Sequence, residues 1–356
     1  MATIQDVAAL AGVSISSVSN VLNGRTEKLG RETYRRIEAA IRELGYRPNL
    51  VARQLKTGNA HLLGVLVPST ANPMFGELAV HIEAAAKEQQ NLRVLLANSH
   101  RDREQESSIF EELLALGVHG VILASSPTDE SHLEAAVERG MAVVSYDRDG
   151  DHASRVDHVS PDYMIATRMA VEHLVGKGHR RLTLLTPDLK TASRVRKREG
   201  FLAAAHAAGL GATANILEVI AGAGHGDSNL ADAGYASAAR IAAMPASRRP
   251  TGIVTINDMM ALGLMAGLHH AGLSVPRDVS VVGMDNLVMT AYANPPLTTV
   301  AIPSREMASA MVRMVAERLA DPTLAGRETL FAPTLIERGS VAPPPARTSP
   351  SRKGTA

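Results

Sequence analysis

Polar and aromatic side chains follow several predicted strands, at the positions where open α/β sheets bind their ligands. Asp147, Asn257 and Asp285 offer carboxylate and amide groups that can hydrogen-bond the hydroxyls of a small molecule, and Phe75 offers an apolar face. The competing interpretation of each polar residue is a helix N-cap or a turn residue. The residue types therefore indicate the binding of a polar small molecule.

Two further acids, Asp162 and Asp258, are expected to be N-caps rather than ligand contacts. Asn72 and Met74 follow the first predicted strand and belong with the candidate ligand contacts.

Motifs for catalysis do not occur in the sequence. It contains no G-x-S-x-G, no P-loop and no H-E-x-x-H, and its 13 His residues are scattered. The absence of Cys excludes thiol catalysis and thiolate zinc sites. Gly222 to Gly226 begins like a dinucleotide fingerprint, but the third required glycine falls on Asp227. The sequence therefore predicts no enzyme, no metal and no cofactor.

Composition narrows the class of protein further. With 356 residues, 45 % hydrophobic and 21 % charged, the chain is typical of a multidomain globular protein. It contains no apolar run of about 20 residues and no signal-peptide pattern at its start. These features and the absence of Cys predict a cytoplasmic protein with no membrane partner.

Strands and helices alternate from Leu62 onward, which favours parallel sheets covered by helices. About 280 residues of this pattern exceed one core, so we expect two α/β lobes. The predicted strands are 62–67, 93–97, 120–124, 142–146, 182–185, 216–220, 252–256 and 280–283. The predicted helices are 75–89, 104–116, 130–139, 163–177, 194–208, 231–243 and 259–271.

The first 58 residues differ in charge from the rest of the chain. They contain nine Lys and Arg against five Asp and Glu, a net charge of +4, which leaves −3 for the remainder. A basic segment of this kind suggests a module that faces phosphate groups, although a solvated helix face would look similar.

Apolar residues in this segment recur at helical spacing on both sides of Gly12, which predicts a helix, a tight turn and a second helix. Ser14 is the expected N-cap of the second helix. A third helix is predicted from Arg31 to Glu43, and Gly45 is placed to end it. The pattern predicts a helix-turn-helix domain, with another small three-helix bundle as the alternative. The exposed face of the second helix carries short, uncharged side chains that suit contact with base edges: Ile15, Ser16, Ser19, Asn20 and Asn23.

A short helix is predicted between Asn49 and Gly58, where Leu50, Val51 and Leu55 are apolar. Because so short a helix is marginal alone, it should be ordered only against DNA or a second copy. The alternative is a flexible linker.

At this point a resemblance becomes specific. TIQDVAALAGVSISSVSNVLNG (Thr3 to Gly24) and LGYRPNLVARQLKTG (Leu44 to Gly58) resemble the N-terminal module of the LacI family of bacterial transcriptional regulators. Similar positions continue through Gly200-Phe201 and Val282 to Asp285 to the closing segment Leu335 to Val341, so the resemblance covers about residues 2 to 342.

The resemblance implies a homodimeric repressor that binds a near-palindromic operator and responds to a small molecule, such as a sugar, bound between two lobes. It places the chain crossings between the lobes near residues 160, 290 and 320–330. The implied DNA contacts are Thr3, Ser14, Ile15, Ser16, Ser17, Ser19, Asn20, Asn23, Asn49, Ala52, Leu55 and Lys56. The implied effector contacts are Asn72, Met74, Phe75, Asp147, Ser193, Lys197, Asn257 and Asp285.

One position departs from the family. Many relatives have Arg three residues before the Gly-Phe pair, where this chain has Lys197. The role of that Arg could instead pass to Arg196 or Arg198. Basic residues beside a cleft would favour an anionic effector such as a sugar acid or phosphorylated sugar, and a solvent-facing helix is the alternative.

The expected domain organisation is a helix-turn-helix domain (1–45), a hinge (46–60), a two-lobed effector and dimerisation domain (61–342) and a disordered tail (343–356). The tail contains no leucine heptad through which it could tetramerise. Two alternatives are a solute-binding protein of a transporter, which would lack residues 3–58, and a sugar-modifying enzyme, which would need an acid/base pair in the cleft.

Overall fold

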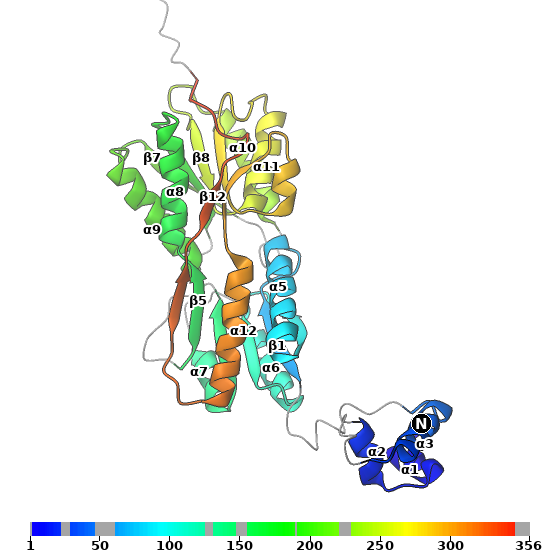
Figure 1. The fold of residues 1–356 in the computed structure, drawn as a ribbon. Helices are drawn as coiled ribbons and strands as arrows, with labels where there is room; N and C mark the ends of the chain where they lie inside the picture. Colours follow the sequence, from blue (N-terminus) through cyan, green and yellow to red (C-terminus); the bar gives the residue numbers. More distant parts are fainter. Residues whose placement is uncertain are drawn as a thin grey trace, which may run out of the picture. The chain divides into compact units, whose positions relative to one another are not determined.

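The computed structural model describes residues 2–22, 29–46, 61–124, 131–146, 155–188, 191–220 and 229–345 (Figure 1). The chain divides by its internal contacts into two compact units, Met1–Ala60 and His61–Ala356. The predicted hinge, apart from Tyr46, and the tail after residue 345 lie outside the described residues. Pro344, at the start of the predicted tail, lies against Gly178.

Three helices form the N-terminal unit, as the sequence predicts: α1 (Ile4–Ala11), α2 (Ile15–Leu22) and α3 (Arg31–Glu43). Helix α1 begins with a capping box formed by Thr3 and Asp6 and ends at Gly12, whose φ of 60° is a left-handed conformation that favours glycine. The backbone N–H of Ser17 donates to the hydroxyl of Ser14 at 3.1 Å, which confirms Ser14 as the cap of α2. The core of this unit consists of Val7, Ala8, Ala11, Val18, Ile37 and Ala40.

The second unit contains two α/β lobes. Lobe 1 has a six-stranded sheet in the order β11-β5-β4-β3-β1-β2, in which every pairing is parallel. Its strands are β1 (Leu62–Val67), β2 (Arg93–Asn98), β3 (Gly120–Leu123), β4 (Ala142–Tyr146), β5 (Asp157–Pro161) and β11 (Glu328–Phe331). Its helices are α5 (Pro73–Gln90), α6 (Arg103–Ala115), α7 (Ser131–Glu138) and α12 (Ser304–Ala320).

Lobe 2 has a six-stranded sheet in the order β12-β10-β9-β8-β6-β7, which is parallel except for β12. Its strands are β6 (Leu182–Pro187), β7 (Ala214–Val219), β8 (Gly252–Thr255), β9 (Ser280–Asp285), β10 (Thr298–Ala301) and β12 (Thr334–Ile336). Its helices are α8 (Tyr163–Gly176), α9 (Ala192–Ala207), α10 (Leu230–Ala242), α11 (Asp258–His270) and the 3-10 helix η1 (Val288–Tyr292).

The predicted two-lobed α/β architecture is confirmed, and each predicted strand and helix of the body is present with ends within a few residues. Six of the described elements escaped prediction: β5, β10, β11, β12, the long helix α12 and the 3-10 helix η1.

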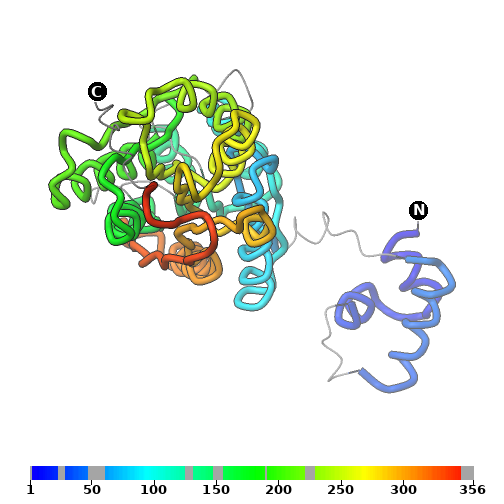
Figure 2. The backbone as a smooth tube through the Cα atoms, turned by 90° about the horizontal axis from the view of Figure 1, so that it is seen from above, coloured from blue at the N-terminus to red at the C-terminus, as the bar shows by residue number. Residues whose placement is uncertain are grey.

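Helices cover both faces of each sheet. In lobe 2, α8 and α9 pack on one face, while α10 and α11 pack on the other, as Figure 2 shows from above. In lobe 1, α5 and α12 lie side by side against one face and share its largest core cluster (Figure 1).

The chain passes between the lobes three times, after β5 at Asp162, after β10 at residues 302–303 and after β11 at residues 332–333. The first crossing agrees with the expectation near residue 160. The second lies beyond the expected position near 290, because η1 and β10 complete lobe 2 before the chain leaves it. The third likewise lies just beyond 320–330, because α12 and β11 still belong to lobe 1.

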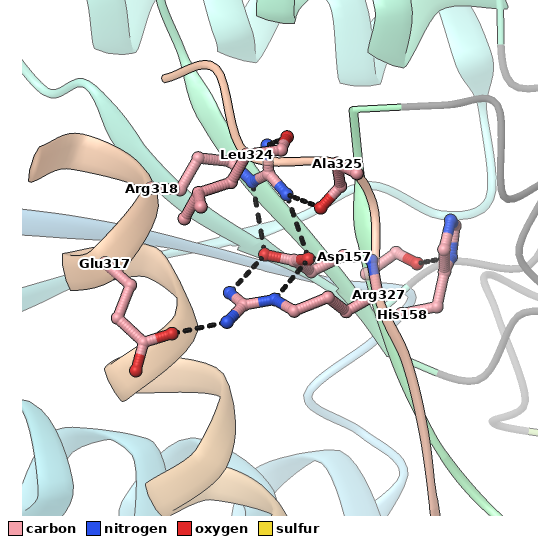
Figure 3. A network of polar contacts seen from close by, with 8 residues as sticks. Asp157, His158, Glu317, Arg318, Leu324, Ala325 and Arg327 are labelled. Carbon is pink, nitrogen blue, oxygen red and sulfur yellow. Dashed lines mark hydrogen bonds and ion pairs between the residues drawn. The ribbon is translucent and has the colours of Figure 1, made fainter. Parts of the chain in front are cut away.

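A buried ion cluster joins the late segment of lobe 1 to its early sheet (Figure 3). Asp157 in β5 is fully buried and accepts hydrogen bonds from Arg318 in α12 at 2.9 and 3.1 Å. Arg327, just before β11, adds a backbone and two side-chain hydrogen bonds to the same carboxylate at 3.0 Å. Glu317 pairs with the outer side of Arg327. The cluster ties α12 and β11 to β5.

Glycines allow α10 and α11 to touch through their backbones. A Cβ at Gly263 would lie 1.8 Å from the carbonyl oxygen of Ala231, and one at Gly234 would lie 2.2 Å from that of Met260. Gly267 is similarly close to Tyr235. These two helices therefore pack at a distance that only glycine permits.

Candidate functional site

A pocket that is open to solvent lies between the two lobes. Lobe 1 supplies the first turn of α5 and the segment after β2, and lobe 2 supplies α9 and the carboxyl ends of β8 and β9. The lining residues are Asn72, Met74, Phe75, Arg101, Tyr163, Ser193, Arg194, Lys197, Leu230, Ile256, Asn257 and Asp285. Seven of the eight predicted effector contacts thus meet in one pocket, and the eighth, Asp147, lies outside the described residues.

Two of these residues also cap helices, which is the competing interpretation that the sequence left open for them. The side-chain oxygen of Asn72 accepts from the backbone N–H of Met74 at 3.1 Å, and that of Asn257 accepts from Met260 at 3.0 Å. Capping uses only the carbonyl oxygen of each amide. Within the part of the chain that the structure describes, no hydrogen bond uses the NH₂ groups of Asn72 and Asn257, which can donate to a ligand.

Lys197 extends from α9 into the pocket and is 6 % exposed. Its Nζ donates to the carbonyl oxygen of Ile256 at 3.0 Å and lies 4.4 Å from the centre of the Tyr163 ring. A carbonyl and an aromatic face hold the ammonium without neutralising it.

The other basic residues of α9 divide between pocket and solvent. Arg194 is buried and lines the pocket, one turn before Lys197. Arg196 and Arg198 are exposed and pair with Glu199, at 3.5 Å, and with Glu218. Lys197 itself therefore occupies the pocket position, and neither Arg196 nor Arg198 replaces it.

Asp258 corrects one prediction and Asp162 confirms another. Asp162 caps α8 through the N–H of Ile165, but the cap of α11 is Asn257, and Asp258 lies one residue further, in the interior. The Asp258 carboxylate accepts from the hydroxyl of Thr299 at 2.6 Å and the N–H of Leu287 at 2.8 Å. Tertiary partners decide which of two adjacent cap-forming residues becomes the cap.

Asp258 positions the pocket residue Asp285 through the turn that follows β9. Asp285 and Asn286 have φ of 115° and 59°, which are unfavourable for residues other than glycine. The bond from Asp258 to Leu287 fixes the end of this turn. Burial raises the pKa of Asp258 to about 7, against the opposing effect of these hydrogen bonds.

Arg101, Tyr163 and Arg194 line the pocket but were not among the predicted contacts. Arg101 follows β2, so the strand-end rule that selected Asp285 applies to it too. Arg194 belongs to the basic run that the sequence analysis singled out. Tyr163 carries no such signal, because it is the first residue of a helix that begins where the chain enters lobe 2.

The predicted DNA-facing residues of α2 lie on one side of that helix. Ser14, Ile15, Ser16 and Asn20 are exposed, whereas Val18 is buried on the opposite side. Ser17 and Ser19 are partly exposed, and the Ser17 hydroxyl lies 2.9 Å from that of Ser14. Thr3 is exposed at the start of α1, with its hydroxyl in the capping box.

The remaining predicted DNA contacts lie outside the described residues: Asn23, Asn49, Ala52, Leu55 and Lys56.

Within the described ranges, no group of three or more His, Cys, Asp or Glu side chains could hold a metal ion. No helix there has the length and apolarity needed to cross a membrane.

Two family models match the chain. The model for bacterial regulatory proteins of the lacI family matches residues 3–49, and the model for a periplasmic binding protein-like domain matches residues 171–341. The ribose operon repressor of Escherichia coli (strain K12) is 32 % identical over 346 residues, which cover 96 % of this chain and 100 % of the relative.

Solved structures match most of the chain. The lac repressor dimer bound to operator and the anti-inducer ONPF matches with a TM-score of 0.82 at 26 % identity, covering 96 % of this chain and 99 % of that one. A LacI family regulator from Enterococcus faecium with bound ribose matches with a TM-score of 0.69 at 26 % identity, covering 79 % and 99 %.

A helix-turn-helix unit joined to a two-lobed α/β unit with a pocket between its lobes defines a ligand-responsive DNA-binding regulator. The full-length match to a repressor narrows this class: the chain belongs to the lacI family of bacterial transcriptional regulators. The helix-turn-helix interpretation is thereby confirmed over the alternative three-helix bundle. Two of these relatives, the ribose operon repressor and the lac repressor, are named as repressors.

Proposed function

We propose that this protein is a transcriptional repressor that acts as a homodimer on a near-palindromic operator and is released or retained by a small molecule in the interlobe pocket. The observation that carries the proposal is the convergence of seven predicted effector contacts on that pocket, in a chain that begins with a helix-turn-helix. The lac repressor neighbour is a dimer on operator DNA, which supports the same assembly here. The proposal assigns regulation rather than catalysis, in the cytoplasm.

Control of DNA binding then follows from thermodynamic linkage. An effector that favours the lobe arrangement incompatible with DNA lowers operator affinity by the same factor by which DNA lowers effector affinity. The proposal includes the domain division at residues 45, 60 and 342. It also places Leu55, one of the DNA contacts that the resemblance implies, in the minor groove, where an apolar side chain can wedge between base steps.

The proposed effector is a sugar or sugar derivative. The amides of Asn72 and Asn257 and the carboxylate of Asp285 suit several hydroxyl groups, while Phe75 supplies an apolar face. The Enterococcus faecium neighbour with bound ribose supports this class of ligand.

Selection of bound sequences from random duplex DNA, with and without a panel of metabolites, tests the proposal. We expect enrichment of a two-fold symmetric site and a change in its affinity with one or more metabolites. Enrichment of no sequence, or turnover of a candidate sugar by the purified protein, would contradict it.

Asn20 is expected to read one base pair in each half-site. An exposed Asn on the recognition helix can bond adenine N6 and N7 together, which contributes about 1–3 kcal/mol of discrimination. Asn20→Ala should therefore relax the base preference at one symmetric pair of positions, measured by repeating the selection. Gln5→Ala, which removes an exposed amide from α1, is the control and should leave the sequence preference unchanged. An unaltered preference in Asn20→Ala would refute the assignment.

Asp285 is expected to be needed for the effector response but not for DNA binding. Its removal leaves ligand hydroxyls unpaired in the pocket, at a cost of about 1–3 kcal/mol per group. Asp285→Ala should weaken effector binding by calorimetry about tenfold or more while operator affinity without ligand stays near that of the wild type. Asp232→Ala, on the exposed side of α10, is the matched control. A full ligand response in Asp285→Ala would remove this residue from the effector site.

A further inference from the structure

The turn after β9 holds the pocket residue Asp285 in a conformation that the backbone does not favour by itself. Asp285 and its neighbour Asn286 both have positive φ, 115° and 59°, and Asp285 lines the interlobe pocket. Two consecutive residues other than glycine persist in this region only where the surrounding structure holds them there. The groups that hold this turn therefore decide where the Asp285 carboxylate lies.

Backbone hydrogen bonds to Thr299 and Asp258 form the first set of restraints on the turn. The N–H of Asn286 donates to the hydroxyl of Thr299 at 3.4 Å, and the N–H of Leu287 donates to the buried carboxylate of Asp258 at 2.8 Å. These bonds restrain the backbone after Asp285, but they reach neither the side chain of Asn286 nor helix η1.

Arg338 supplies a second set of restraints. Its guanidinium donates to the side-chain oxygen of Asn286 at 2.6 Å, to the hydroxyl of Thr290 in η1 at 3.1 Å and to the carbonyl oxygen of Leu297 at 2.8 Å. Because the guanidinium is planar and charged, it fixes the directions of these bonds as well as their lengths. One side chain thus ties the turn to η1 and to the segment that follows η1.

Arg338 belongs to a segment that is itself well anchored in lobe 2. The backbone N–H of Arg338 donates to the hydroxyl of Thr298 at 2.9 Å. Two residues further, Ser340 is fully buried, and its hydroxyl donates to the carbonyl oxygen of Val281 in β9 at 2.6 Å. Arg338 therefore reaches the turn from a backbone that the sheet holds in place.

The charge of Arg338 also acts on Asp258. Burial raises the pKa of the Asp258 carboxyl, whereas the positive charge of Arg338 lowers it and favours the carboxylate, the form that accepts the N–H of Leu287. Arg338 and Asp258 therefore support each other in holding the same turn.

We propose that Arg338 is a positioning residue for effector binding, which keeps the Asp285 carboxylate in the pocket by holding Asn286 and η1. The inference rests on the proposed function for the role of Asp285 toward an effector, whereas the ordering of the turn by Arg338 needs no ligand. Arg338 lies 52 residues beyond Asn286 in the sequence, so only the fold brings the two together.

Hydrogen exchange of the full-length protein without ligand, followed by mass spectrometry, tests the ordering of the turn. Arg338→Met removes the charge and all three side-chain hydrogen bonds. It should speed exchange about tenfold or more in the peptide that contains the amides of Leu287 and Thr290, while exchange in β8 stays near that of the wild type. Unchanged exchange in this peptide would overturn the inference. An equal increase in β8 would overturn it too, because it would show a general loss of stability.

Arg249→Met is the matched control. Arg249 is also a partly buried arginine of lobe 2, and it donates to the carbonyl oxygens of Ala242 and Met244. It precedes β8, at the edge of the sheet opposite the pocket, so exchange in the turn should stay at the wild-type rate. Faster exchange there in Arg249→Met would contradict a specific role for Arg338.

Arg338→Lys keeps the charge but not the planar group, so its exchange in the turn should lie between those of the wild type and Arg338→Met. If Arg338→Met does not fold, Arg338→Lys decides the question, and a wild-type rate in this variant would refute the inference.

Calorimetric titration with D-ribose measures the consequence for binding. Arg338→Met should bind ribose about tenfold more weakly than the wild type, the effect of one hydrogen-bonding group that leaves its position. In the Asp285→Ala background, Arg338→Met should cause no further loss, because its effect passes through Asp285. Additive losses, or wild-type affinity in Arg338→Met, would contradict the positioning role. A wild type that binds no ribose would count against the proposed sugar effector instead, and hydrogen exchange would then decide the role of Arg338.

Discussion

Asp157→Asn is expected to lower the free energy of unfolding by about 3–5 kcal/mol at pH 7, the usual cost of breaking a buried ion pair from one side. The Arg318 guanidinium is 2 % exposed and would lose its counter-charge. The new NH₂ group would also face N–H donors of Arg318 and Arg327 that now bond a carboxylate. Urea unfolding followed by circular dichroism measures the change, because the chain has no Trp.

Glu317→Gln is the matched control for this variant. Glu317 belongs to the same cluster, but its side chain is 41 % exposed, so its loss should cost less than about 1 kcal/mol. Similar losses of unfolding free energy in the two variants would show that the buried Asp157 pair contributes no more to stability than the exposed Glu317 pair.

The deficit of Asp157→Asn should depend on pH. Burial favours a higher pKa for Asp157, but the hydrogen bonds from Arg327 and Arg318 outweigh burial and hold the pKa below its usual value. A carboxyl whose pKa is lowered by folding stabilises the protein above its unfolded pKa, about 3.9, and loses that contribution as pH falls through the folded pKa. The difference between wild type and variant should therefore be full at pH 7 and shrink below about pH 4. A constant difference across this range would contradict the assignment.

Gly263→Ala is expected to destabilise lobe 2 by about 3 kcal/mol, the upper part of the range for overpacked cores. The added Cβ would meet the backbone oxygen of Ala231 at 1.8 Å, and a backbone atom cannot rotate away as a side chain can. Helices α10 and α11 would have to separate. The loss is measured as a lower midpoint of urea unfolding in Gly263→Ala than in the wild type, with the same dependence of unfolding free energy on urea concentration in both.

Gly176→Ala is the control for Gly263→Ala. Gly176 is an exposed glycine at the end of α8 in the same lobe, and a Cβ there meets no atom within 4 Å. Alanine should be neutral or slightly stabilising at this position. Equal destabilisation by both variants would show that α10 and α11 can separate to accept the added Cβ without a loss of stability.

The elements predicted from sequence are those whose pattern is local. The N-terminal helices bury Val7, Val18 and Ile37 within one short segment, so periodicity and capping residues suffice. Helix α12 also has apolar periodicity, at Met307, Met311 and Val315. It escaped prediction although this pattern is local; what the sequence does not indicate is its packing partner, a sheet built mostly from residues 62–161 and completed by β11.

Strand β5 escaped prediction for a related reason. It begins with Asp157 and His158, which no apolar run would include, and both are buried. Asp157 is buried because Arg318, 161 residues away, neutralises it. His158 bonds Ser145 of the neighbouring strand at 2.6 Å. Buried charge in a strand is understood only when its distant partner is known.

The predicted pocket depended on a rule of topology rather than on local pattern. Polar residues at strand ends were expected to meet, and Asn72, Asn257 and Asp285 do line one pocket. The rule locates backbone positions but not the residues that helices bring to them. That Tyr163 and Lys197 line the pocket while Arg198 is exposed depends on how α8 and α9 are oriented, which the rule does not give.

The late position of α12 and β11 in the chain also orders events during synthesis. Five of the six strands of lobe 2 lie in the continuous segment 182–301, so a nascent chain can assemble most of that lobe early. Lobe 1 begins emerging from the ribosome first, yet Asp157 has its first cation only when Arg318 has emerged and its second only when Arg327 has emerged. The lobe translated first is therefore completed after most of the lobe translated second.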